Sequence, residues 1–274
     1  MKQQFNTVNY QWLTAPTGDP FADIGGFAIK ELAERFLEKD ILELIEYVTN
    51  IYVERWEAKI NPFFLNSKIT QPAFNSKKKI EETMLYFKSL INESDCNVTG
   101  YCRITGQQGK LFSAGRDNSK LSGSGTFINF HHAFESGIMA SKEVLIRFHF
   151  VPLGCVYLQG KIALIHSNDH YLSEFFARKN CNANLSAISK GLSDGVLKSE
   201  YKSPGTALFR FIDKALNSKE TFNYSREADT NKNSSLTLYH FTNFGASPEV
   251  TIYSVPNRLF AFYRYMQGPE VQSD

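Results

Sequence analysis

Two histidines and an aspartate at helical spacing are the residues of this sequence most suited to hold a metal ion. His166 and His170 lie four positions apart with Asp169 between them, and on a helix that spacing puts two imidazoles on one face. A divalent cation held there could activate water for hydrolysis. These residues straddle an expected strand-to-helix turn, however, where helical geometry does not hold. A stand-alone metal-dependent hydrolase of nucleic-acid metabolism is therefore kept as the alternative function.

The cysteines of the chain do not follow a zinc-binding pattern. They are Cys96, Cys102, Cys155 and Cys181. Five residues separate Cys96 from Cys102, whereas structural zinc half-sites have about two to four. Four cysteines are also too few for a disulfide framework in 274 residues, which indicates a reducing compartment. We expect no metal site and no cofactor.

The sequence lacks the motifs of nucleophilic and nucleotide-dependent catalysis. The chain has no G-x-S-x-G, Walker, G-x-G-x-x-G or H-E-x-x-H motif in its required context. Carboxylates are frequent over residues 31–57, but lysine and arginine neighbours make them typical of a solvent-exposed surface. Because no set of acid, base and nucleophile emerges, we expect a protein that is not an enzyme.

A basic, glycine-rich segment is the strongest candidate for binding. Residues 94–126 hold six glycines among Ser, Asn and Gln, and basic residues outnumber acidic ones there. Glycine lets a backbone enter a groove of a duplex, cations neutralise phosphates, and amides contact base edges. An ordinary surface loop in a protein with a purely structural role is the competing interpretation. We predict a long irregular loop in which DNA is contacted by Lys110, Arg116, Asn118 and Lys120, with Gln107 and Gln108 as secondary choices.

Apolar residues recur at helical spacing through the N-terminal third of the chain. Asp23 is a candidate N-cap of the first helix, and Asp19 and Asp23 together are expected to shape the turn and cap this helix. Asp40 and Glu43 are spaced as a capping box at the start of the second. The predicted helices cover about 23–36, 40–59 and 76–91, within a helical part of about 20–92.

The middle and end of the chain show the patterns of β-strands. Gln159-Gly160 between two apolar runs predicts a hairpin turn, and Asn168 or Asp169 can cap a following helix. The predicted strands are 144–151, 155–158, 161–165, 236–241 and 250–253, with a helix over 206–216. These patterns predict an α+β fold in a single domain over residues 1–274. Its helical N-terminal third is followed by a mixed, largely antiparallel sheet with packed helices over about 127–256.

Composition narrows the compartment and the class of partner. Hydrophobic residues make up 42% of the chain and the net charge is +2, so a free-standing nonspecific DNA binder is disfavoured. The apolar runs are shorter than the ~18 residues of a membrane span, and the start has no uninterrupted apolar core of a signal peptide. We expect a cytoplasmic protein without membrane insertion.

Segments in three parts of the chain resemble one family. Thr17–Gly25 reads TGDPFADIG, residues 127–137 read FINFHHAFESG and are followed by VPLG and IHS, and residues 236–256 contain YHFTN and IYSVP. In this order they resemble the large subunit of type I-B CRISPR effector (Cascade) complexes, in the branch with paired CXXC motifs. Residues 140–143 read ASKE where that branch has its second CXXC, and the resemblance stops near Pro256, before the family's helical C-terminal part.

The resemblance implies a noncatalytic subunit of an antiviral ribonucleoprotein complex. It implies binding at the 5′-handle end of the crRNA and recognition of the protospacer-adjacent motif of target double-stranded DNA, which starts R-loop formation. The implied protein partners are the backbone and handle-binding subunits and a separate small subunit. Because the guide RNA reads most of the sequence, a nearly neutral subunit with a local basic patch suffices. Asn129, His131 and His132 match the family's central block and would contact nucleic acid or make structural hydrogen bonds, and Asn243 is expected at a turn.

Overall fold

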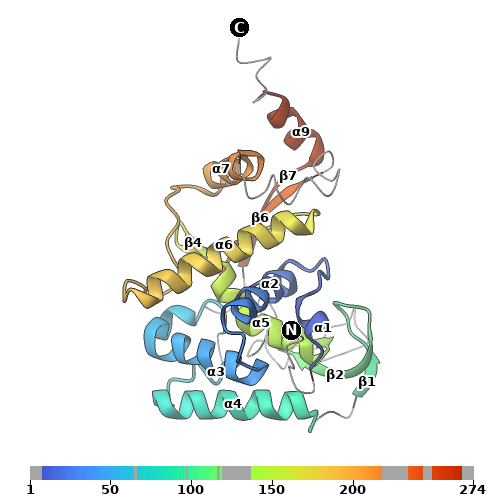
Figure 1. Ribbon diagram of the computed structural model, residues 1–274, viewed down its shortest axis with the longest axis vertical. Coiled ribbons are helices and arrows are strands. Elements are labelled where there is room, and N and C mark those ends of the chain that lie inside the picture. The colour runs from blue at the N-terminus through green and yellow to red at the C-terminus, as the bar shows by residue number, and fades with distance from the viewer. Residues whose placement is uncertain are drawn as a thin grey trace.

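The computed structural model describes most of the chain and has an α+β fold. Helices come first, and two antiparallel sheets with further helices follow (Figure 1), so the predicted fold class is confirmed. No helix in the described part has both the length and the apolar character needed to cross a membrane. The described residues are 8–64, 67–94, 96, 98–115, 118, 137–217, 234–242 and 249–266.

The first long helices begin at side-chain caps. Helix α2 begins at Pro20, because the Asp19 carboxylate accepts a hydrogen bond from the Ala22 backbone N–H at 2.7 Å. The N-cap is therefore Asp19, one of the two aspartates expected to shape this turn and cap the helix, and the prediction that Asp23 is the N-cap is wrong. Helix α3 begins at the predicted capping box of Asp40 and Glu43, which is confirmed. The elements of this part are α1 (Tyr10–Thr14), α2 (Pro20–Arg35), α3 (Ile41–Ile51), the short turns η1 (Tyr52–Trp56) and η2 (Glu57–Ile60), and α4 (Ser76–Asn92).

A small three-stranded sheet follows α4. Two of its strands lie within 98–114, so the prediction of an irregular loop is wrong for this part of the chain. Gly100 faces Gly109 in the strand register, and Gly106, with a φ angle of 69°, lies between the two strands. These glycines are therefore part of a β-hairpin, and Gly106 provides the positive φ angle of its turn. The strands are β1 (Val98–Tyr101), β2 (Gln108–Ala114) and β3 (Ile138–Ala140), in the order β1-β2-β3.

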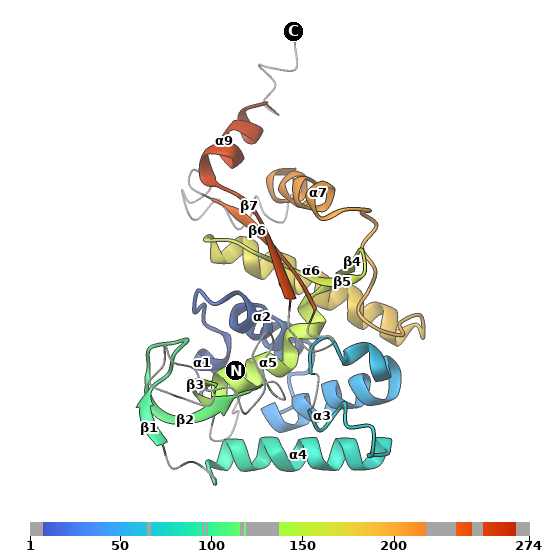
Figure 2. The ribbon, with the colours of Figure 1, turned by 180° about the vertical axis from the view of Figure 1, so that it is seen from behind.

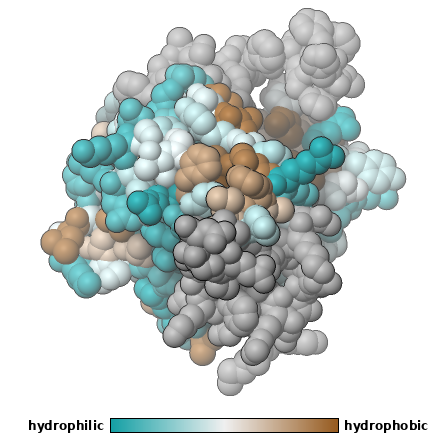
Figure 3. Space-filling view, turned by 90° about the horizontal axis from the view of Figure 1, so that it is seen from above, coloured by the Kyte–Doolittle hydropathy of each residue, from teal (hydrophilic) through white to brown (hydrophobic). Residues whose placement is uncertain are grey.

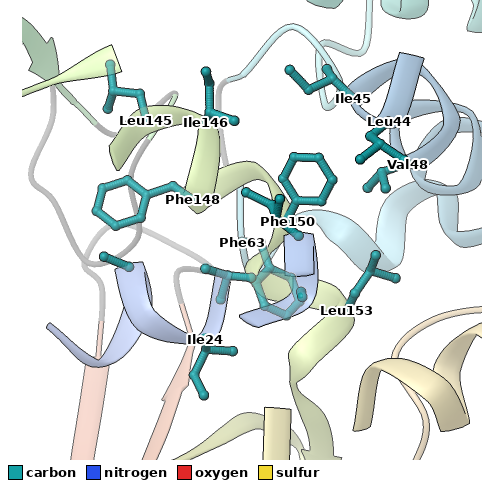
Figure 4. Packing of buried hydrophobic residues seen from close by; sticks show 14 of the residues in the cluster. Ile24, Leu44, Ile45, Val48, Phe63, Leu145, Ile146, Phe148, Phe150 and Leu153 are labelled. Carbon is teal, nitrogen blue, oxygen red and sulfur yellow. The ribbon is translucent and has the colours of Figure 1, made fainter. Parts of the chain in front are cut away.

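The segment 144–151, predicted as a strand, belongs instead to the central helix α5 (Lys142–Phe150) and the turn after it. Leu145, Phe148 and Phe150 leave this helix in different directions, and all three are buried (Figure 4). A helix that is buried on every side carries a continuous apolar run, and a buried strand carries the same pattern. Packing against α2 and the other helices, not local periodicity, decides this element.

A four-stranded antiparallel sheet forms the second part of the molecule. Gln159 and Gly160, with φ angles of 44° and 85°, make the predicted hairpin turn. Asp169 caps the following helix, as predicted. The strands in sheet order are β4 (Val156–Leu158), β5 (Lys161–His166), β6 (Leu236–Thr242) and β7 (Glu249–Val255), and the other elements are η4 (Val151–Gly154), α6 (His170–Ser189), α7 (Pro204–Asn217) and α9 (Asn257–Met266).

Two hydrophobic clusters lie on opposite faces of this sheet. Ile162 and Leu164 belong to the larger cluster, with helices α2, α3 and α5. Ala163 and Ile165 alternate to the other face and join a smaller cluster with α7. Strand β5 is thus covered on both faces, which accounts for its unbroken apolar sequence. Helix α4 lies at one end of the molecule, and α7 and α9 lie toward the other (Figures 1 and 2).

The end of the molecule formed by α7, β7 and α9 exposes apolar side chains. Ile252, Phe262 and Tyr265 are each more than half exposed. Seen from this end, hydrophobic residues gather among hydrophilic ones (Figure 3). Exposed apolar groups of this kind are typical of a surface that contacts another protein.

Candidate nucleic-acid interface

The β1–β2 hairpin brings together three of the predicted contact residues. Gln108 is the first residue of β2, Gln107 directly precedes it, and Lys110 follows on the same strand. Tyr101 faces Gln108 in the register and Thr99 faces Lys110, so strand alternation places Tyr101, Gln108 and Lys110 on one face. All three are exposed, Tyr101 by 61%. This hairpin face, defined by Tyr101, Gln108 and Lys110, presents an aromatic ring, an amide and a cation.

Lys110 is held by an acidic side chain at the end of α4. Its Nζ lies 3.0 Å from Glu93 Oε2, and Glu93 Oε1 lies 2.8 Å from Lys142 Nζ. Hydrogen bonds from Lys142 and Lys110 hold the pKa of Glu93 below its usual value. The Lys110 side chain remains 47% exposed. A phosphate that reaches Lys110 therefore competes with Glu93 for the same ammonium group.

Asn118 uses its amide within the chain. Its Oδ1 accepts the Gly115 N–H at 2.7 Å, and its Nδ2 donates to Ser113 O and to Tyr86 Oη, both at 3.1 Å. These bonds attach the chain after β2 to helix α4. The structure thus gives Asn118 a positioning role, and contact with nucleic acid stays a prediction for it.

The remaining predicted contact residues lie outside the described part of the chain. They are Arg116, Lys120, Asn129, His131, His132 and Asn243. Their assignments stay predictions.

A buried polar centre forms around Asp23 of α2. Its carboxylate accepts hydrogen bonds from Thr17 N–H (2.6 Å), Thr17 Oγ1 (2.7 Å) and Gly18 N–H (3.0 Å), and His166 Nε2 lies 3.4 Å from its Oδ2. Burial raises the pKa of this carboxyl, but the hydrogen bonds from His166, Thr17 and Gly18 outweigh burial, and the pKa lies below its usual value. Asp23 therefore ties the turn before α2 to strand β5.

Arg147 of α5 closes the same centre from another side. The side chain is 1% exposed, Nε and Nη2 donate to the backbone carbonyl of Trp12, and Nη1 lies 3.8 Å from Asp23 Oδ1. Burial lowers the pKa of Arg147 to about 10, against the opposing effect of Asp23 and Glu143. Nη1 has no hydrogen-bond partner among the described residues. The sequence gives only one signal for this residue, a basic side chain inside an apolar run, and that signal did not identify it as part of a site.

The three residues of the alternative metal site do not come together. His166 faces Asp23. Asp169 Oδ1 accepts the Tyr171 N–H at 3.0 Å, and the exposed His170 ring lies 4.1 Å from the Tyr171 ring. In the described part of the chain, no group of three or more His, Cys, Asp or Glu side chains could hold a metal ion.

Four of the segments that carry the family resemblance, TGDPFADIG, VPLG, IHS and YHFTN, meet around helix α2, whereas residues 127–136 lie outside the described part of the chain. His166, within the segment IHS, faces Asp23, within Thr17–Gly25. The Phe21 ring lies 6.2 Å from Tyr239 and 5.2 Å from Phe241, both in the later segment. A Cβ at Gly154, within VPLG, would lie 2.5 Å from the Ile24 side chain, so this segment also lies directly against α2. Comparisons with protein-family models, with curated proteins and with solved structures found no match to the chain.

Proposed function

We propose that this protein is the noncatalytic large subunit of a type I-B CRISPR Cascade complex in the cytoplasm. The observation that carries the proposal is the meeting, around helix α2, of four of the segments that resemble this family. The characteristic segments of one domain are expected to pack around a shared structural centre, as these four do. These segments then have a scaffold role, which leaves contact with nucleic acid to other surfaces.

The hairpin face, together with the neighbouring Gln107, supplies the chemistry for contact with target DNA. Lys110 can neutralise a phosphate, Gln107 and Gln108 can reach base edges, and Tyr101 can stack on a base that has left the duplex. A two-stranded ribbon also fits the major groove of B-form DNA. The hairpin is therefore our candidate for recognition of the protospacer-adjacent motif in target double-stranded DNA, the step that starts R-loop formation.

The proposed partners are those of a subunit at one end of the complex. They are the 5′ handle of the crRNA, the backbone and handle-binding subunits, and a separate small subunit. The exposed apolar side chains of β7 and α9 suit a permanent contact with one of these proteins. A net charge of +2 is sufficient because guide pairing reads most of the target.

Recovery of RNA with the protein tests the proposal. The tagged full chain is purified from cells that express its neighbouring genes and a CRISPR array, and the copurified RNA is sequenced. We expect short RNAs that share one 5′ handle and differ in their guides, together with backbone subunits. Purification of the protein without repeat-derived RNA would contradict the proposal.

Selection of DNA by the assembled complex tests the hairpin. A library of duplexes with a randomised flank is bound, and the bound fraction is sequenced. The double variant Gln107→Ala, Gln108→Ala should relax the preferred flanking motif, because each lost base contact is worth about 1–3 kcal/mol of discrimination. Lys110→Ala should weaken binding to all target sequences to a similar extent. An unchanged motif profile in the double variant would place motif recognition outside the hairpin.

A further inference from the structure

A cavity of about 180 Å³ lies between α4, α5 and the segment that precedes α4. Four aromatic rings line it, those of Phe64, Tyr86, Phe87 and His149. The His149 ring lies 4.8 Å from that of Phe87 and 5.8 Å from that of Phe64. This cavity is distinct from the hairpin face and from the Asp23 centre. The polar side chains around it include Lys68, Gln71 and Asn118.

The size and lining of the cavity fit one small, planar ring. An apolar cavity of about 150 Å³ holds one benzene molecule, so the space here accommodates a six-membered ring with its substituents. Aromatic walls favour a planar ligand through stacked and edge-on contacts. Lys68 and Gln71 are exposed, and their donors can reach carbonyl oxygens of a bound ring. A pyrimidine base combines these properties.

Helix α4 connects the cavity to Glu93, the acidic partner of Lys110. Phe87 lines the cavity from α4, and Glu93, which pairs with Lys110, lies six residues further along. At 1.5 Å per residue this separation is about 9 Å along the helix. A stacked strand advances about 3.4 Å per nucleotide along its axis, and an unstacked strand advances further, so a strand of a few nucleotides spans the two positions.

We propose that this cavity binds one unstacked pyrimidine base of a single-stranded nucleic acid whose backbone passes Lys110. The inference rests on the proposed function and adds a site to it. The hairpin face contacts phosphates, and the cavity takes one base out of the stack. Stacking on the aromatic wall offsets the cost of unstacking that base.

Two oligomers of equal charge test the base site. An octamer of uridine and an octamer of abasic nucleotides carry the same phosphates but differ in their bases. We expect the full chain to bind the uridine octamer about 5- to 100-fold more tightly, the range given by one base stacked on aromatic side chains. Equal affinities, or no binding of either octamer, would overturn the base site. The proposed function is judged separately, by the recovery of crRNA.

Two matched variants test whether the cavity causes the preference for the uridine octamer over the abasic octamer. Phe87→Leu removes one wall and should reduce the affinity for the uridine octamer to that for the abasic octamer, whose unchanged binding reports a folded protein. Phe27→Leu changes a similarly buried phenylalanine of α2 outside the cavity and should keep the preference. A preference that survives Phe87→Leu would overturn the site.

Photo-crosslinking gives a test that needs no variant. A uridine octamer that contains 4-thiouridine should crosslink to residues 67–71 or 83–87 of the unmodified chain. Crosslinks confined to the hairpin would overturn the cavity as the base site. Free uridine that binds as tightly as the octamer would identify a site for a small metabolite and would overturn the assignment to a strand.

Discussion

Asp23 connects parts of the chain that lie far apart in the sequence. It accepts hydrogen bonds from the turn before α2, and it faces His166 on β5 and Arg147 on α5. A buried ion pair adds little net stability compared with apolar packing, but removal of one partner leaves the other charge buried and uncompensated. The loss of Asp23 is therefore expected to be costly.

Asp23→Asn should lower the free energy of unfolding at neutral pH by about 3 kcal/mol or more, because Arg147 then stays buried without this countercharge. The pKa of Asp23 in the folded protein lies below the ordinary value of 3.8. Its contribution is therefore present above that pH and is lost as the pH falls through the lower folded value. Denaturant unfolding at several pH values should show that the difference between wild type and variant shrinks in acid. A difference independent of pH would contradict this prediction.

Glu93 limits the attraction between Lys110 and phosphate. Glu93→Gln should tighten binding to DNA, because it releases Lys110 and Lys142 from their shared carboxylate. Lys110→Ala should weaken binding and reduce the slope of log K against log salt by about 0.9. Gel shifts over a salt series measure both effects. As a control, Lys59→Ala removes a lysine that also pairs with an acid, Asp194, and it should change neither quantity.

Helices α2 and α5 pack with their backbones in contact. A Cβ at Gly25 would lie 2.0 Å from the Arg147 carbonyl oxygen, so only glycine permits this approach. The close packing places the Arg147 side chain beside Asp23. The geometry of the polar centre thus depends on the absence of a side chain on the neighbouring helix.

Gly25→Ala should lower the free energy of unfolding by about 3 kcal/mol or more, because the clash is with backbone and cannot be relieved by a side-chain rotation. Gly205→Ala is the matched control on helix α7, where nothing lies within 4 Å of an added Cβ. That substitution should raise stability by up to about 1 kcal/mol, since alanine favours a helix over glycine. Thermal unfolding of both variants measures the contrast. Equal stability of Gly25→Ala and wild type would show that the helices do not pack this closely.

Strand β5 and helix α6 each contribute side chains to both hydrophobic clusters of the molecule. Strand β5 sends alternate side chains into each cluster. Helix α6 does the same: Cys181 and Leu185 join the larger cluster, and Phe175 joins the smaller one. Shared elements couple the two clusters, so we expect the chain to unfold as one cooperative unit.

Phe211→Ala tests this coupling from the smaller cluster. The substitution should lower the free energy of unfolding by about 3–5 kcal/mol, as for other buried phenylalanines. Both tryptophans, Trp12 and Trp56, lie in the N-terminal part. Tryptophan fluorescence and far-ultraviolet circular dichroism should therefore report the same lowered transition. A fluorescence transition that stays at the wild-type temperature would reveal two independent domains.

Local signals predicted several elements correctly. The capping box at Asp40, the turn at Gln159-Gly160 and the cap at Asp169 all formed, because each depends on bonds between residues close in sequence. Helix α5 was missed because its apolar run has the pattern of a buried strand. The hairpin was missed because its glycines are equally typical of a loop.

Residue type and spacing were enough to establish the α+β class, the helix caps at Asp40 and Asp169 and the concentration of cations and amides near Lys110. Only the tertiary structure paired Glu93 with Lys110, placed His166 and Arg147 beside Asp23, and brought four aromatic rings around a cavity. The physical reason is the range of the interactions. Caps and turns close hydrogen bonds within a few residues, whereas buried pairs and cavities are selected by the packing of the whole core, which no local pattern encodes.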